Sequence, residues 1–159
     1  MSFRVQSRNF MNIKLELYKL CEDYVNQRLQ TVEEIISSNK KALQSETKSS
    51  AGDKHETGRA MLQLEMEKAG QQLVGIFQMK EILAKIDVSR TSEIAHLGSI
   101  IETNSVNYFL SISAGQVRAK SKTYFAISVS SPIGKLLLGK KAGDEIVFNK
   151  KKDKVLKIT

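Results

Sequence analysis

The chain has 159 residues, enough for one ordinary domain or two small ones. Its 25 Lys and Arg outnumber its 17 Asp and Glu, and the net charge of +8 indicates an acidic partner, either nucleic acid or a negatively charged protein surface. Only 6% of the residues are aromatic and Trp is absent, so a platform for stacking the bases of single-stranded nucleic acid is not favoured.

The single cysteine, Cys21, excludes an intrachain disulfide and a cysteine-based zinc site, and it favours a reducing compartment. Residues 1–10 lack the apolar stretch of a signal peptide, and no run approaches the roughly 18 apolar residues that cross a membrane. The expectation is therefore a soluble, cytoplasmic protein, most simply a monomer, that does not contact membranes.

Two long helices are predicted within residues 1–88. Residues 12–48 contain no Gly or Pro, and their apolar residues recur at alternating spacings of four and three, with one shift near Tyr24. Residues 54–86 repeat this heptad pattern, which is typical of coiled coils. The predicted seam positions are Ile13, Leu17, Leu20, Tyr24, Val25, Leu29, Val32, Ile36 and Leu43 in the first helix, and Leu62, Met66, Ala69, Leu73, Ile76, Leu83 and Ile86 in the second.

The two seams fit each other as an antiparallel hairpin. Facing residues in such a hairpin have numbers that add up to a constant, and the pairs Ile36 with Ala69 and Val32 with Leu73 both add up to 105. The midpoint falls between Gly52 and Asp53, directly after the turn-like residues 49–52. The sequence therefore predicts a coiled-coil hairpin over residues 1–88 with Asp53 at its tip.

Residues 89–159 have a different pattern, made of short runs rich in β-branched and aromatic residues. These runs predict strands at residues 99–103, 106–113, 123–129, 144–149 and 154–158. A short helix is predicted between the third and fourth strands, with Ser131 as its N-cap, Pro132 at its first position and Gly139 just past its end. The expected fold class is α+β: a helical hairpin followed by a small, mostly antiparallel sheet with one helix.

Two motifs resemble the GreA/GreB transcript cleavage factors. Residues 128–148, SVSSPIGKLLLGKKAGDEIVF, resemble the C-terminal signature of that family. Residues 52–56, Gly-Asp-Lys-His-Glu, resemble its Gly-Asp-x-x-Glu hairpin tip. The two motifs stand in the family's order along the chain, so the resemblance extends over the whole architecture.

The resemblance implies an FKBP-like domain over residues 89–159 that docks on bacterial RNA polymerase at the secondary channel, while the coiled coil enters that channel. Residues of the signature then become docking candidates. In the family, the tip carboxylates help to hold a catalytic Mg²⁺ and orient water, so that the polymerase itself cleaves backtracked RNA. By position these roles fall to Asp53 and Glu56. The docking candidates are Ser131, Pro132, Ile133, Gly134, Gly139 and Lys140.

Asp53 and Glu56 also have a purely structural interpretation. Their spacing of three places both carboxylates on one helix face, but it is equally the spacing of a capping box at a helix start. Two carboxylates alone hold Mg²⁺ poorly, since the ion takes six oxygen ligands. The protein is therefore expected to have no cofactor of its own and to share Mg²⁺ with the polymerase.

Basic residues near the tip offer a second kind of contact. Lys48, Lys54 and Arg59 could guide the 3′ end of the backtracked RNA by its phosphates, a contact that does not depend on sequence and weakens with salt. The alternative is a solvated helix surface without a partner, and the sequence does not choose between the two.

Two other functions remain open at this point. After Glu56 the chain continues with Thr57 and then Gly58-Arg59-Ala60-Met61, whereas the family's tip usually continues with Asn and then Ala-Glu-Tyr-His. This departure leaves a regulator that occupies the channel and inhibits the polymerase without cleavage as the alternative. A prolyl isomerase is a weaker rival, because the aromatic residues it needs for a pocket stand at strand positions expected to be core.

Overall fold

A computed structural model of the chain describes residues 3–48 and 52–159, and the side chains of residues 13–45 and 56–159. The chain forms two compact units that do not follow its linear order. The coiled-coil unit is Val25–Lys80, and the sheet unit combines Met1–Tyr24 with Glu81–Thr159. The predicted division at residue 88 stays a prediction.

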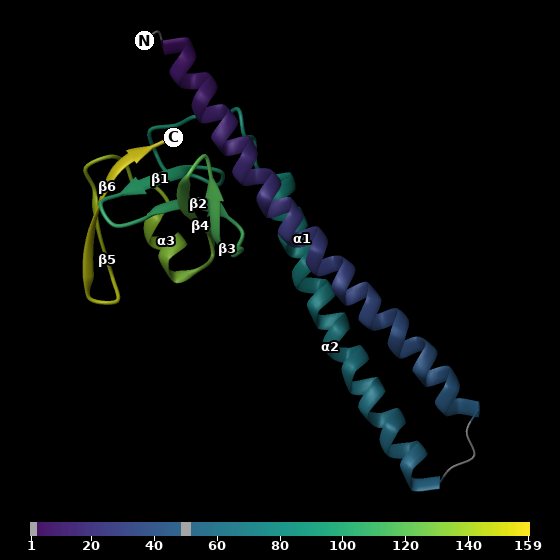
Figure 1. Cartoon of the computed structure of the whole chain (residues 1–159). Helices are drawn as coiled ribbons and strands as arrows, with labels where there is room; N and C mark the ends of the chain where they lie inside the picture. The colour runs from purple at the N-terminus through teal and green to yellow at the C-terminus, as the bar shows by residue number, and fades with distance from the viewer. Residues whose placement is uncertain (1–2, 49–51) are drawn as a thin grey trace. The chain divides into compact units, whose positions relative to one another are not determined.

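The coiled-coil unit contains the second half of the long helix α1 (Phe3–Lys48) and most of α2 (Gly52–Ala84), which run antiparallel (Figure 1). Every predicted seam position of both helices is buried or partly buried, which confirms the heptad pattern. Within the coiled-coil unit the deepest are Val25 and Val32 in α1 and Ala69 and Ile76 in α2, all less than 5% exposed. The hydrogen bond from Asn39 to Glu65, whose numbers add up to 104, agrees with the predicted register to within one residue.

The sheet unit contains six strands and the short helix α3 (Pro132–Leu137). The sheet has the order β3-β4-β2-β1-β6-β5, with β2 and β4 parallel and the other neighbours antiparallel. The α+β class is thus confirmed, while the FKBP-like character stays a prediction. The strands are β1 (Ile100–Thr103), β2 (Asn107–Ser111), β3 (Gly115–Ala119), β4 (Lys122–Ser128), β5 (Glu145–Phe148) and β6 (Lys151–Ile158).

Strand β3 was not predicted, because residues 115–119 read as a polar connection. Its side chains alternate between solvent and a partly covered face, and only Ala119 is buried. It lies at the edge of the sheet and pairs with β4 alone. An edge strand buries little apolar surface, so its composition lacks the β-branched enrichment that marks the inner strands.

The first part of α1 packs within the sheet unit. Cys21 is buried, and its Sγ lies 3.7 Å from the Oγ of Ser111 in β2. Lys14, only 1% exposed, donates a hydrogen bond from Nζ to the backbone oxygen of Arg90 over 2.7 Å. Burial lowers the pKa of Lys14 to about 8, although the carboxylate of Asp87 opposes this shift. The helix is therefore held to the sheet unit by a polar contact that apolar patterning did not reveal.

A core of aliphatic residues lies between the sheet and α3. Its buried members come from β1, β2, α3, β5 and β6 and from the segment before β1: Ile101, Leu110, Leu137, Ile146, Val155 and Ala95. Among the described residues, no helix is both long and apolar enough to cross a membrane.

Candidate functional site

Helix α3 begins as the sequence predicts. Ser131 is the N-cap, with its Oγ accepting a hydrogen bond from the backbone nitrogen of Gly134 at 3.1 Å and donating one to the backbone oxygen of Ser128 at 2.6 Å. Pro132 occupies the first helical position. A Cβ on Gly134 would stand 2.0 Å from that same Ser128 oxygen, so only glycine fits. The Ser-Pro-Ile-Gly motif is thus a tightly closed helix start.

The turn after α3 is tied to the segment that precedes β1. The backbone nitrogen of Gly139 bonds the oxygen of Ala95 at 2.9 Å, and the nitrogen of Ala95 bonds the oxygen of Lys140 at 2.8 Å. Gly139 has φ +79°, in the left-handed region that favours glycine. Farther along, Asp144 accepts a hydrogen bond on Oδ2 from the nitrogen of Lys141 at 2.9 Å. The Gly-Lys-Lys-x-Gly-Asp motif therefore forms one rigid loop.

The six docking candidates fall into two groups. Pro132 and Gly139 are exposed and present this loop region to solvent, and Ser131 and Lys140 are partly exposed. Gly134 is buried, and Ile133 packs against the aliphatic core. The last two can influence a partner only by shaping the surface around them.

A groove of about 510 Å³ opens beside the loop. Ile94 and Leu156 both line it and are 55% and 54% exposed, so together they present apolar area to solvent. Charged side chains of Glu93, Lys141 and Lys157 stand at its border. The groove could not be predicted from the sequence, because Ile94 and Leu156 are 62 positions apart and neither breaks the apolar pattern of its own segment.

The sheet unit offers no sign of an aromatic binding pocket at this groove, whose lining is aliphatic and charged. Phe109 and Tyr124 are buried at 0% and 2% exposure, as expected for core positions. The prolyl isomerase interpretation therefore gains no support from the described residues.

The start of β6 carries a buried carboxylate that was not predicted from the sequence. Asp153 is 8% exposed and accepts hydrogen bonds on Oδ2 from the hydroxyls of Thr103 and Ser105. Burial raises the pKa of this carboxyl, but the hydrogen bonds from Ser105, Thr103 and the backbone of Lys154 outweigh burial and hold the pKa below its ordinary value. Asp153 is a structural group that fixes the turn between β1 and β2.

The tip candidates are only partly described. Glu56 and Arg59 are exposed near the start of α2, which begins at Gly52. Asp53 lies in the same first turn of backbone, but its side chain and those of Lys48 and Lys54 lie outside the described residues. The capping box thus stays a prediction. Among the described side chains, no group of three His, Cys, Asp or Glu could hold a metal ion.

One part of the chain matches a known protein family. No curated protein matches the chain. Residues 104–159 match the family model described as "Transcription elongation factor, GreA/GreB, C-term". The match includes α3, its capped start, the loop after it and strands β2 to β6, which are the features described above. This part of the chain is therefore similar to the C-terminal domain of the GreA/GreB transcription elongation factors.

Proposed function

We propose that this protein is a transcription elongation factor that binds bacterial RNA polymerase at its secondary channel and stimulates cleavage of backtracked RNA. The observation that carries the proposal is the combination in one chain of a segment similar to the GreA/GreB C-terminal domain with a preceding antiparallel coiled coil that bears Glu56 near the start of α2. The hairpin extends into the secondary channel, and the C-terminal domain binds the polymerase. The protein acts as an accessory to the polymerase, which performs the catalysis.

The surface around Pro132, Gly139 and Lys140 is the proposed docking site. Support comes from the adjoining groove, where Ile94 and Leu156 expose apolar area that a partner would remove from water. The hydrogen bonds between Ala95 and residues 139–140 hold this surface in one shape before binding, which lowers the entropic cost of association. Its lysines favour a partner surface that carries acidic residues.

The tip acts through Asp53 and Glu56. A carboxylate oxygen is the ligand type that Mg²⁺ prefers, and the exposed Glu56 can present one. Two carboxylates leave most positions around the ion for oxygens of the polymerase, the RNA and water. When bound there, Mg²⁺ would lower the pKa of a water molecule and neutralise charge on the phosphate under attack. The part played by this chain is to bring the two acids to that place and hold them there.

Arg59, together with Lys48 and Lys54, contributes to RNA cleavage by contacting the phosphates of the extruded RNA. Arg59 is exposed, so its guanidinium is available for this contact. Contacts to phosphates weaken as salt rises, because they depend on the release of counterions from the nucleic acid.

Backtracked elongation complexes test the proposal directly. Stalled complexes with end-labelled RNA are incubated with Mg²⁺ and either the wild type, Asp53→Asn, Glu56→Gln or the control Glu67→Gln, which changes an exposed acid elsewhere on α2. We expect the wild type and the control to shorten the RNA and both tip variants to lose this effect.

Two other outcomes would contradict stimulation of RNA cleavage. Unchanged RNA together with slowed elongation supports the alternative, a factor that occupies the channel and inhibits. Absence of polymerase binding by the wild type rules out both functions.

A further inference from the structure

We propose that the hydrogen bond between Asn39 and Glu65 sets the register of α1 against α2 and thereby fixes which residues stand at the tip. The inference deepens the proposed function, which requires Asp53 and Glu56 at the tip. It can nevertheless be tested without polymerase, because register is a property of the hairpin itself.

Asn39 occupies a position where the heptad pattern calls for an apolar residue. From Val25 to Leu43, α1 has a series of buried and partly buried residues at spacings of four and three, and Asn39 falls in that series between Ile36 and Leu43. It is 7% exposed, and among the described side chains of the coiled-coil unit it is the only buried polar one. A buried asparagine at a seam position costs stability and specifies the alignment of the helices.

Its partner on α2 is defined. The Nδ2 of Asn39 donates a hydrogen bond to Oε2 of Glu65 over 3.1 Å. Because the acceptor is ionised, the bond is stronger than one between two neutral amides. Loss of the acceptor would leave a buried amide without a partner, which destabilises the observed register.

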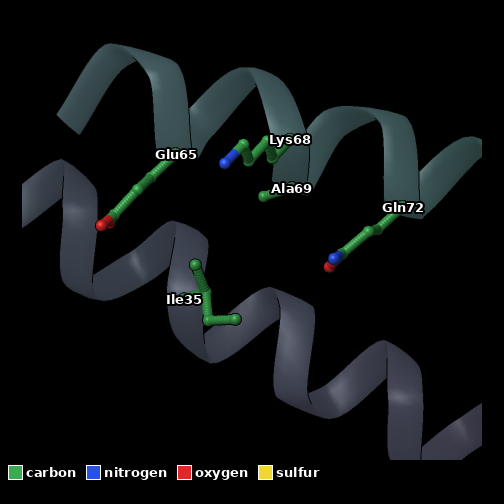
Figure 2. A pocket seen from close by; sticks show the side chains of 5 residues that line it. All are labelled: Ile35, Glu65, Lys68, Ala69 and Gln72. Atoms are coloured by element: carbon green, nitrogen blue, oxygen red, sulfur yellow. The ribbon is translucent and has the colours of Figure 1, made fainter. Parts of the chain in front are cut away.

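Apolar packing alone does not fix this register. A slip by one heptad still sets most apolar seam positions opposite other apolar seam positions, although in one direction it brings Val32 opposite Lys80. Packing beside the pair is also loose, since Ala69 is small and leaves a hollow of about 310 Å³ that Ile35, Lys68 and Gln72 also line (Figure 2). Within the coiled-coil unit, the polar pair is therefore the feature that distinguishes the registers.

The two slipped registers would give Asn39 different partners. One places Gly58 at the site of Glu65 and offers no side-chain acceptor. The other places Gln72 there, whose neutral amide reaches toward α1 as Glu65 does (Figure 2). That second slip moves the midpoint of the hairpin from residue 52 to between residues 55 and 56. Glu56 would then move from the start of α2 into the connection between the two helices. The carboxylate of Glu65 thus keeps the acid pair on helical backbone.

Cysteine pairs report the register. In a Cys21→Ser background, Val32→Cys is combined with Leu73→Cys for the observed register, with Met66→Cys for one slip and with Lys80→Cys for the other. Brief oxidation of the purified full chain is followed by mass mapping of intrachain disulfides. Each pair is made with Asn39, with Asn39→Leu, with Glu65→Ala and with the control Ile36→Leu, which changes a neighbouring seam residue without removing a polar group.

With Asn39 present we expect the disulfide from residue 32 to residue 73 and no slipped pairs. Asn39→Leu should reduce the yield of that disulfide by roughly half or more and produce slipped pairs, while its melting temperature rises or stays level, because a buried polar group has been removed. Glu65→Ala should also produce slipped pairs, and Ile36→Leu should match the wild type.

A single register in both Asn39→Leu and Glu65→Ala overturns the proposal. If Asn39→Leu does not fold, Glu65→Ala decides alone, since Glu65 is exposed and its loss leaves the apolar seam intact. A failure of polymerase binding or RNA cleavage, by contrast, would bear on the proposed function and leave this result unchanged.

Discussion

Thr103 and Asp153 stand 50 positions apart, and the Oγ1 of Thr103 donates a hydrogen bond to Oδ2 of Asp153 over 3.0 Å. Ser105 donates to the same oxygen, and the backbone nitrogen of Lys154 donates to the other carboxylate oxygen at 3.0 Å. All of these bonds favour the ionised carboxylate, so its folded pKa lies below the ordinary value. The link between β6 and the β1–β2 turn therefore depends on the charge of Asp153.

Asp153→Asn should destabilise the protein by about 1–3 kcal/mol at pH 7, because charge-assisted hydrogen bonds to a buried group are lost. Since the folded pKa is depressed, the stabilisation is present above the unfolded pKa of about 4 and is lost as pH falls through the folded pKa. Melting temperatures measured from pH 7 to pH 2 should show the wild type and Asp153→Asn converging at the acid end. An equal gap at every pH would show that the charge is not responsible.

Gly134→Ala should destabilise the sheet unit by about 2 kcal/mol or more, since its Cβ would stand 2.0 Å from the backbone oxygen of Ser128. Gly70→Ala is the matched control, because a Cβ there meets nothing within 4 Å inside α2, and it should stabilise by up to about 1 kcal/mol. Chemical denaturation of both variants measures the difference. Equal stability of the two variants would contradict the close approach at α3.

Lys14→Met should stabilise the protein near pH 7 by about 1–3 kcal/mol, because it removes a charge from a site that disfavours it. The folded pKa of about 8 lies below the unfolded value near 10.5, so the unfolded chain binds more protons between these values. Wild-type stability should therefore rise with pH from about 8 to 10.5, relative to the variant. Urea denaturation of both proteins at pH 7, 8.5 and 10 measures this, and a constant difference would contradict it.

Leu156→Asp should weaken polymerase binding about tenfold or more if the groove beside the Gly-Lys-Lys loop is the docking site, because it places a charge on an apolar floor. Val147→Asp provides the control, since Val147 is 59% exposed on β5 and does not line the groove. Fluorescence anisotropy with labelled protein and core polymerase measures both. Equal weakening by the two substitutions would indicate a general effect of negative charge rather than a defined site.

Much of this fold could be predicted because its signals are local. The start of α3 depends on Ser131, Pro132 and Gly134, which act within one helical turn, and the coiled coil depends on a spacing that repeats along one segment. Such features need no knowledge of distant residues.

What could not be predicted depends on contacts between distant segments. Lys14 is buried because Arg90 supplies an oxygen 76 positions away, and Asp153 is buried because Thr103 and Ser105 supply hydroxyls. Asn39 was the exception, since the gap that it fills between Ile36 and Leu43 was visible in the heptad series itself. Its role was hidden only because the pattern was drawn from apolar residues alone.

The two outer strands of the sheet, β3 and β5, have a consequence for how the protein behaves at high concentration. An open strand edge can recruit the strand of another molecule, which leads to aggregation. Both edges are short, of five and four residues. Exposed cations stand on or beside them, with Arg118 on β3 and Lys150 next to β5. Adding a foreign strand would bring like charges together and gain few hydrogen bonds, so these edge cations also oppose misassembly.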